Sequence, residues 1–229
     1  MTENLDPRCS ICGVAVNARA CYAEEGKGPD NCPTKMLQEL AEEANQEYAD
    51  AKVREFARLA SVQEAECYQE RDRKPYLLHA SKPRIQEICE FADKISAKKL
   101  GLAFCVGLAL EARLVDNIFT RQGFQVVSVV CKVGRMLKED LGIKDEEKIF
   151  IGTDESACNP ILQAKVLNHA GTDLNVLLGL CVGHDSLFLK YAEAFNTVLA
   201  VKDRVTGHNP LAAIYTQNSY YMFTQRPGF

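Results

Sequence analysis

From residue 83 to the end of the chain, short apolar segments alternate with segments of helical periodicity. The apolar segments are rich in β-branched and aliphatic residues and predict strands over 100–105, 124–131, 149–152, 174–181 and 197–202. The segments between and after them predict helices over 108–123, 134–141 and 159–168, then a helix that Asp185 can cap, and a last one over 209–215. Continuous apolar strands alternating with helices are typical of a parallel sheet covered on both faces. We therefore predict an α/β fold, a three-layer αβα sandwich with a mostly parallel sheet, over residues 83–229.

The first part of the chain has a different pattern. Residues 1–35 show little apolar periodicity, contain four cysteines and several glycines, and predict a loop folded around a ligand. Residues 36–82 predict a helical segment packed on the core, with one long helix or two with a break up to about residue 73, and a turn-like stretch over 75–81. Pro83 opens a helix that Lys98 and Lys99 are expected to close.

Composition narrows the class of protein. The chain has 229 residues with 27 Lys and Arg against 31 Asp and Glu, and this formal net charge of −4 argues against a nucleic-acid-binding surface. No apolar run approaches the roughly 18 residues of a membrane span, and the N-terminus lacks the basic and apolar regions of a signal sequence. We expect a cytoplasmic protein with no membrane partner. Ten cysteines in a reducing compartment then indicate metal or thiol chemistry rather than disulfides.

Four of the cysteines have the spacing of a metal site. They form the pattern Cys9-x2-Cys12-x8-Cys21-x10-Cys32, with Pro33 directly after the last one. A Cys-x2-Cys pair places two sulfurs around one metal, and a single pair with a final Cys-Pro favours a [4Fe–4S] cluster. Structural zinc is the alternative, since zinc is also held by four thiolates.

A second group of cysteines follows the predicted strands. Cys105, Cys131 and Cys181 each end a strand and precede a glycine, and Cys158 lies just before a predicted helix. Because the carboxyl ends of parallel strands meet at one edge of a sheet, we expect these four cysteines to share that edge. They would hold a second metal centre or form a reactive thiol pocket. Cys67 and Cys89 lie on helical apolar stripes and are expected in the core.

Polar residues accompany the strand-end cysteines. His184 and His208 follow the last two strands and, with Lys202 and Asp203, are the candidates for acid–base or substrate-contacting roles. Candidate cofactor-binding residues are Lys132, Asn159 and Asn209, and Lys132 and Lys202 could compensate the charge of an anionic cluster or substrate.

Several segments resemble those of a known family. They are Cys9-x2-Cys12, Cys158-Asn-Pro160, Gly179-Leu-Cys-Val-Gly-His-Asp185 and Lys202-Asp-Arg-Val-Thr-Gly-His-Asn-Pro210. Together they resemble the uncharacterised cysteine-rich proteins of anaerobic bacteria and archaea that form domain-of-unknown-function family 1847. The resemblance covers nearly the whole chain, and it implies a metal-binding protein with no assigned reaction.

These features predict a metal-binding, iron–sulfur protein acting in redox chemistry or electron transfer, with a cysteine-lined second site at the carboxyl edge of the sheet. An iron–sulfur-dependent redox enzyme and a pure electron carrier both stay open. A redox partner protein or a small-molecule substrate is expected, and a homodimer is allowed for. One alternative is a non-redox binding or sensor protein with structural zinc in the N-terminal loop and a cysteine-rich ligand pocket. Another is a metal-free thiol enzyme with one cysteine nucleophile.

Overall fold

The computed structural model describes residues 6–228 of the chain. The chain divides into two compact units, one ending at Val62 and one beginning at Gln63. The segment predicted as helical over 36–82 is thus shared between the two units. None of the helices in the described residues is long and apolar enough to cross a membrane.

The N-terminal unit contains two short 3-10 turns followed by helices. The turns are η1 (Cys9–Ile11) and η2 (Val16–Ala18), and the helices are α1 (Pro33–Met36), α2 (Gln38–Glu47) and α3 (Ala51–Glu66), which extends into the second unit. The break between α2 and α3 has a local cause. The Asp50 carboxylate accepts hydrogen bonds from the backbone amides of Lys52 and Val53, at 2.7 and 3.1 Å, and so caps the start of α3.

The second unit opens with a small hairpin and a helix. β1 (Tyr68–Gln69) pairs antiparallel with β2 (His79–Ala80), where a turn-like stretch was predicted. α4 (Arg84–Lys94) begins after Pro83 as predicted, but the prediction that it closes at Lys98 and Lys99 is wrong. Ser96 adopts a left-handed backbone with φ of 59°, which ends the helix. The amides of Lys98 and Lys99 instead bond to the Asp173 carboxylate at 2.8 Å as the next strand begins.

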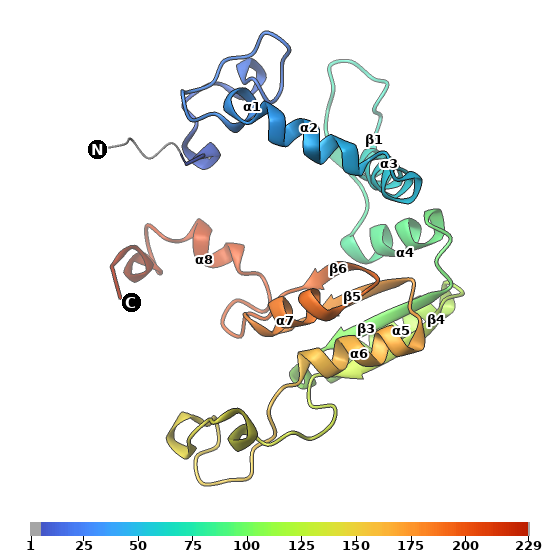
Figure 1. Ribbon diagram of the computed structural model, residues 1–229, viewed down its shortest axis with the longest axis vertical. Helices are drawn as coiled ribbons and strands as arrows, with labels where there is room; N and C mark the ends of the chain where they lie inside the picture. Colours follow the sequence, from blue (N-terminus) through green and yellow to red (C-terminus); the bar gives the residue numbers. More distant parts are fainter. Residues whose placement is uncertain (1–5, 229) are drawn as a thin grey trace. The chain divides into compact units, whose positions relative to one another are not determined.

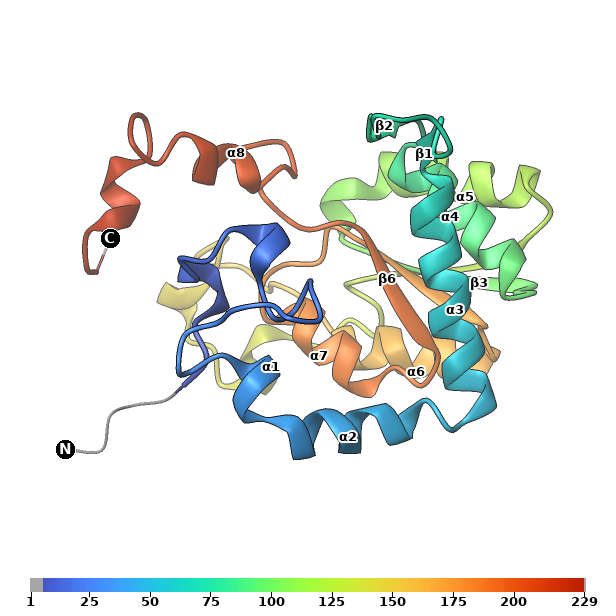
Figure 2. The ribbon, with the colours of Figure 1, turned by 90° about the horizontal axis from the view of Figure 1, so that it is seen from above.

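The predicted α/β fold is confirmed by a four-stranded parallel sheet (Figures 1 and 2). Its strands are β3 (Lys99–Phe104), β4 (Gln125–Val130), β5 (Leu174–Leu178) and β6 (Phe195–Ala200), in the order β4-β3-β5-β6. The connections between them run through α5 (Ala109–Arg121), α6 (Pro160–Ala170) and α7 (His184–Tyr191), with the short turn η3 (Val106–Leu108) before α5. The helices therefore alternate with the strands as a parallel sheet requires.

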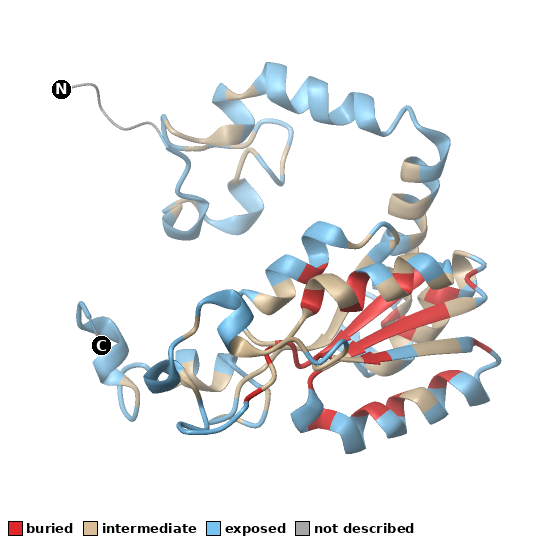
Figure 3. Ribbon diagram, turned by 60° about the horizontal axis from the view of Figure 1, so that its bottom comes forward, coloured by how far each residue is buried: buried red, intermediate tan, exposed pale blue. Residues whose placement is uncertain are grey.

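Each face of the sheet has its own apolar core, which accounts for three layers. On one face, Leu100 and Leu102 of β3 and Val176 of β5 pack against α4 and α5, whose buried residues include Ala92 and Phe119. On the other face, the core residues are Ala103, Val129, Ala164, Leu167, Leu177, Leu180 and Phe188. Ala164 and Leu167 belong to α6 and Phe188 belongs to α7. Figure 3 shows the central strands buried along most of their length. Strands buried on both faces read as continuous apolar runs, which explains why the sequence pattern located them.

The strand order defines where a ligand can bind. The chain passes from β3 outward to β4 and then returns past β3 to β5, so the connections from β3 and β4 leave in opposite directions. In open parallel sheets this reversal opens a crevice at the carboxyl ends of the two strands concerned, here β3 and β5. The residues that follow these strands therefore lie at the usual ligand-binding position of such a fold.

The segment between β4 and α6 differs most from its prediction. In place of a helix over 134–141 it has the 3-10 turn η4 (Lys138–Leu141), because Gly134 and Arg135 both adopt positive φ, 81° and 47°, and cannot start a helix. A second turn, η5 (Asp145–Glu147), follows, and the predicted strand over 149–152 is absent from this described segment.

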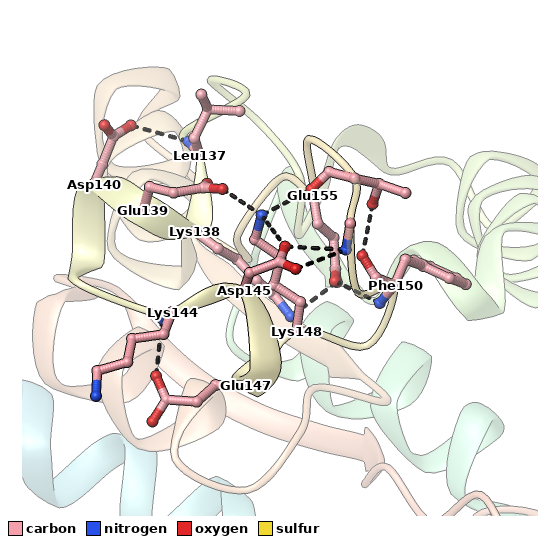
Figure 4. Close-up of polar contacts among 12 residues, drawn as sticks. Leu137, Lys138, Glu139, Asp140, Lys144, Asp145, Glu147, Lys148, Phe150 and Glu155 are labelled. Carbon is pink, nitrogen blue, oxygen red and sulfur yellow. Dashed lines mark hydrogen bonds and ion pairs between the residues drawn. The ribbon is translucent and has the colours of Figure 1, made fainter.

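The absence of that strand has a polar cause, drawn in Figure 4. The buried Glu155 carboxylate accepts the amides of Ile149 and Phe150 at 2.9 and 3.0 Å, and Lys138 pairs with it at 2.9 Å. Lys148 in turn bonds to the carboxylates of Glu139 and Asp145. Amides that bond to carboxylates are not available to a strand partner, so the apolar side chains here point outward from a polar cluster.

Two helix starts in the C-terminal half test the capping predictions. Asn159 caps α6 as predicted, because its Oδ1 accepts the Leu162 amide at 2.9 Å. Asp185 does not cap α7, because that position is taken by Gly183 with φ of 83°, and Asp185 lies inside the first turn. The chain ends with α8 (Leu211–Tyr215), close to its predicted range, and the turn η6 (Met222–Gln225).

Candidate functional site

The four cysteines of the N-terminal unit surround one cavity. Cys9, Cys12, Cys21 and Cys32, separated by up to 23 positions in the sequence, all line a cavity of about 50 Å³, here called the cysteine cavity. Cys12 and Cys32 are half-buried, whereas Cys9 and Cys21 are exposed, and all ten cysteines of the described chain are free thiols. Three basic residues, Arg8, Arg19 and Lys27, line the same cavity.

Backbone hydrogen bonds fold this segment around the cavity. The Cys12 amide donates to the Cys9 carbonyl at 3.2 Å, which forms the turn that brings the Cys-x2-Cys pair together. Arg19 donates through its guanidinium to the carbonyls of Val14 and Cys12, at 2.8 and 3.3 Å. The Lys27 amide bonds to the Ala18 carbonyl at 2.7 Å and closes the loop that contains Cys21. The cavity is therefore built by the backbone and by one arginine, before any ligand is considered.

A glycine makes room for the last cysteine. A Cβ atom placed on Gly28 would lie 2.7 Å from the Cys32 sulfur and 2.8 Å from its Cβ, closer than atoms approach without moving apart. By contrast, a Cβ on Gly13 would meet nothing within 4 Å. Gly28 is therefore the position in this loop at which a side chain would displace a candidate ligand.

The donor set fits a thiolate-bound metal. Four sulfur donors and three cationic side chains share one small cavity, and cationic groups favour the deprotonated thiolates that metals require. Within residues 6–228, no group of three or more His, Cys, Asp or Glu side chains is arranged so that it could hold a single metal ion as it stands. The thiols are thus gathered at one cavity without being closed around one point.

The second set of cysteines meets at the carboxyl edge of the sheet. Cys105 follows β3, Cys131 follows β4, Cys181 lies beyond β5, and Cys158 precedes α6. We call these four the rim cysteines. Backbone bonds fix their places, with the Cys105 amide on the Leu178 carbonyl at 3.1 Å and the Cys131 amide on the Phe104 carbonyl at 2.9 Å. Because β3, β4 and β5 are parallel, their carboxyl ends bring these cysteines to the edge at which they were predicted.

Three of the rim thiols shift one another's pKa. Hydrogen bonding couples the ionisation of Cys105 to Cys131 and that of Cys131 to Cys158. The bond to Cys131 and burial raise the pKa of Cys105 to about 12. The bond from Cys105 lowers the pKa of Cys131, but the bond to Cys158 and burial outweigh it, and the net shift is upward. Cys105 and Cys131 are therefore protonated thiols.

Cys158 is the third of these coupled thiols. The hydrogen bond from Cys131 lowers the pKa of Cys158 to about 7, burial opposes the shift, and the charge of Lys132 assists it. Cys158 is half-buried, whereas Cys131 is only 2% exposed. Cys158 is thus the most acidic of the three linked thiols and is more accessible than the neighbour that activates it.

Basic side chains surround the rim cysteines. The Lys132 ammonium donates to the Ser156 carbonyl, and its charge acts on both Cys158 and His184. Arg204 donates through Nη2 to the Cys181 sulfur at 3.2 Å. The charge of Lys202 acts on Cys105. Positive charge next to thiols stabilises thiolates and attracts anions.

His184 is the predicted histidine that lies at the rim. Its amide donates to the Cys181 carbonyl at 3.0 Å. Burial, followed by the charge of Lys132, lowers the pKa of His184, so its imidazole is neutral at physiological pH. A neutral imidazole at this position can accept a proton from a reacting group.

The other predicted polar residues make structural contacts. The Asp203 amide donates to His208 Nδ1 at 3.2 Å, and the Asp203 carboxylate accepts the amides of Val205 and Thr206, so these residues close their own turn. Asn159 caps α6, and its amide bonds to the Cys131 carbonyl. Asn209 is exposed and accepts the Ala212 amide through its backbone carbonyl. The contacts of Asp203, His208 and Asn209 thus lie within the segment 203–212.

Several residues of the two sites were not among the predictions. Arg8, Arg19 and Lys27 at the cysteine cavity were missed, although each lies within six residues of a predicted ligand. Arg204 was missed despite its place next to Lys202 and Asp203. Gln163 was also missed, and it is fully buried, with Nε2 donating to the carbonyls of Val129 and Phe104 at 2.7 and 3.2 Å. It ties together the ends of β4 and β3, which position Cys131 and Cys105.

The chain of thiols predicts an unusual pH profile for Cys158. Because its pKa is lowered to about 7, its alkylation by iodoacetamide should reach half of its maximal rate near pH 7 and decline below that pH. Cys89 is the internal comparison, because burial raises its pKa above the ordinary 9.0 and its rate should still be rising above pH 9. Peptide mass mapping of alkylated protein measures both rates. A Cys158 rate that rises through pH 9 like that of Cys89 would contradict the hydrogen-bonded arrangement.

Two comparisons with known proteins give the family. The family described as a protein of unknown function (DUF1847) matches residues 32–199. An uncharacterised protein of Methanocaldococcus jannaschii, MJ0455, is 40% identical over 215 residues, which cover 94% of this chain and 96% of that protein. The family match includes Cys32 and the rim cysteines, and the similarity to the archaeal protein extends over nearly the whole chain. The chain belongs to the DUF1847 family.

Proposed function

We propose that the protein is an iron–sulfur redox protein whose N-terminal unit holds a [4Fe–4S] cluster on Cys9, Cys12, Cys21 and Cys32. The observation that carries the proposal is that these four thiols, spread over residues 9–32 of an irregular segment, line one cavity together with three basic side chains. When bound, such a cluster supplies one-electron transfer. The single Cys-x2-Cys pair and the final Cys-Pro favour this cluster over structural zinc.

The residues around the cavity have separable roles in this proposal. The four sulfurs act as ligands, and Arg8, Arg19 and Lys27 offset the negative charge that four thiolates bring together. Arg19 also holds the backbone of the Cys-x2-Cys turn through the Cys12 carbonyl. Two of the ligands, Cys12 and Cys32, are half-buried, whereas Cys9 and Cys21 are exposed.

For the rim cysteines we favour a reactive thiol pocket over a second metal centre. The pKa of Cys105 is raised and that of Cys158 is lowered by the Cys131 thiol between them, and the Cys131 sulfur accepts the Val106 amide at 3.3 Å. This arrangement produces one acidic thiol at the end of a chain of neutral ones. It suits nucleophilic attack by Cys158 on a small molecule.

The proposed chemistry also indicates the cellular compartment and the partners of the protein. Free thiols and an oxygen-sensitive cluster both require a reducing compartment, so we place the protein in the cytoplasm. A redox partner protein or a small-molecule substrate would exchange electrons with it. The rival function is a non-redox sensor with zinc in the cysteine cavity and the rim as a ligand pocket.

Spectroscopy on protein purified without oxygen separates the two functions. The proposal expects visible absorption that bleaches with dithionite and an EPR signal from the reduced cluster, both retained in a Cys89→Ser control. Zinc is d10 and silent in both measurements. Colourless protein containing about one zinc per chain would overturn the iron–sulfur proposal in favour of the sensor.

A further inference from the structure

Cys131 and Cys158 lie at the two ends of one closed loop. The chain leaves the sheet at Cys131, runs through the polar cluster of Figure 4, and returns at Cys158. Two chain segments, residues 131–138 and 155–159, form the base of this loop, here called the neck. The two segments are hydrogen-bonded to each other. The Asn159 amide donates to the Cys131 carbonyl at 2.7 Å, and the Ala157 amide donates to the Met136 carbonyl at 2.7 Å.

Further contacts continue the neck away from the sheet. Leu137 and Ser156 form an antiparallel bridge, and the Lys138 amide donates to the Glu155 carbonyl at 3.1 Å. Lys132 crosses the neck to the Ser156 carbonyl. The backbones beside the two cysteines are therefore hydrogen-bonded side by side, and a disulfide bond needs its two cysteines to be close in this way.

Cys131 also lowers the pKa of Cys158, so the two side chains are neighbours at the base of the loop. Closing a disulfide needs a shift of the side chains, whereas the neck can stay bonded as it is. The ion pairs of Lys148 with Glu139 and Asp145, and of Lys138 with Glu155, keep the body of the loop folded during such a change. The accessible partner is Cys158, and the buried one is Cys131.

We propose that Cys158 and Cys131 are a redox-active dithiol pair that reduces small anionic disulfides, with Cys158 as the attacking thiol and Cys131 as the resolving thiol. In the first step the Cys158 thiolate attacks one sulfur of the substrate, so that a Cys158–substrate disulfide forms and one substrate thiolate leaves. In the second step Cys131 gives up its proton and attacks the Cys158 sulfur, so that the Cys131–Cys158 disulfide forms and the second substrate thiol leaves. Starting from the Cys158 thiolate, the protein loses two electrons and the Cys131 proton, and the substrate disulfide becomes one thiolate and one thiol.

The charge around the pair selects the substrate class. The charge of Lys132 acts directly on Cys158, and Arg204, which donates to the Cys181 sulfur at 3.2 Å, acts together with Lys132 on His184. Cationic side chains at an attacking thiol favour the approach of carboxylate-bearing molecules.

This inference concerns the α/β unit and does not depend on a cluster in the cysteine cavity. The test treats the full chain with glutathione disulfide, blocks remaining thiols with N-ethylmaleimide, and maps disulfides by peptide mass spectrometry. We expect a Cys131–Cys158 disulfide in the wild type and in a Cys89→Ser control. The variant Cys131→Ser should accumulate a glutathione adduct on Cys158, and Cys158→Ser should form neither product.

The preference for anionic disulfides has its own test. Lys132→Gln should slow formation of the glutathione adduct several-fold. Cystamine, a cationic disulfide, should react more slowly than glutathione disulfide.

The outcomes that overturn the inference are equally specific. Mapping the wild type alone decides the pairing, even if a variant fails to fold. Glutathione on Cys105 or Cys181 with no Cys131–Cys158 bond would refute the assignment, and so would metal content that falls in Cys131→Ser. Cys12→Ser separates this result from the cluster, because it should lose iron and still form the Cys131–Cys158 disulfide.

Discussion

Replacing Gly28 with alanine is expected to remove most of the iron and sulfide from anaerobically purified protein. The added methyl group would lie 2.7 Å from the Cys32 sulfur and 2.8 Å from the Cys32 Cβ. The cysteine side chain is too short to move aside by itself, so the backbone that positions the ligand has to shift. A ligand displaced by an ångström does not close a four-ligand site. Iron and acid-labile sulfide per chain measure the effect.

Gly13 provides the matched control for this experiment. It lies next to Cys12, but a methyl group placed there would meet no atom within 4 Å. Gly13→Ala should therefore retain its iron and sulfide while making the same chemical change in the same loop. Equal content in Gly28→Ala and Gly13→Ala would show that the cysteine cavity does not hold the cluster.

Replacing Phe188 with alanine is expected to destabilise the α/β unit by about 3–5 kcal/mol. Phe188 is fully buried on α7 and packs in the core that contains Leu167, Leu177 and Leu180. Removing the ring deletes its apolar contacts and leaves a cavity between α6, α7 and the sheet. The melting temperature of the unit should fall by on the order of 10 °C.

The neighbouring Leu189 is the control for this substitution. It lies on the same helix and is 44% exposed. Leu189→Ala changes the helix surface without opening a cavity, so its effect should stay below about 1 kcal/mol. Thermal unfolding followed by circular dichroism measures both variants. Similar melting temperatures for the two would contradict the two-faced core described for this sheet.

The sheet and the gathering of the rim cysteines could be predicted from the sequence because both depend on local patterns. Runs such as Leu174–Leu178 are apolar without interruption, as strands buried on both faces must be. Once the strands are parallel, cysteines at their carboxyl ends lie at one edge whatever the details of the connections. Cys105, Cys131 and Cys181 were placed together by this rule.

The segment between Cys131 and Cys158 could not be predicted in this way. Ile149, Phe150 and Ile151 read as a strand, but they are 71%, 64% and 66% exposed. Their conformation is set by a carboxylate several residues away, Glu155, which takes the backbone amides that a strand would use. A hydrophobicity pattern does not reveal such a contact between a carboxylate and backbone amides. For the same reason the neck that pairs Cys131 with Cys158 was visible only in the structure.

The basic residues of the two sites illustrate the same limit. Arg19 reaches the Cys12 carbonyl because the loop turns back on itself, and Arg204, which follows β6, reaches the sulfur of Cys181, which follows the neighbouring β5. Neither contact follows from spacing in the sequence. The cysteines could be identified by residue type from the sequence, whereas the basic side chains beside them could be identified only from the structure.

The central claim is that Cys9, Cys12, Cys21 and Cys32 hold an iron–sulfur cluster, and metal analysis of three proteins tests it most directly. Iron, zinc and acid-labile sulfide are measured on the wild type, Cys12→Ser and Cys181→Ser, all purified without oxygen. We predict about four iron and four sulfide per chain in the wild type and in Cys181→Ser, and a loss of both in Cys12→Ser. About one zinc without sulfide in the wild type, or iron that is unchanged in Cys12→Ser, would contradict the account.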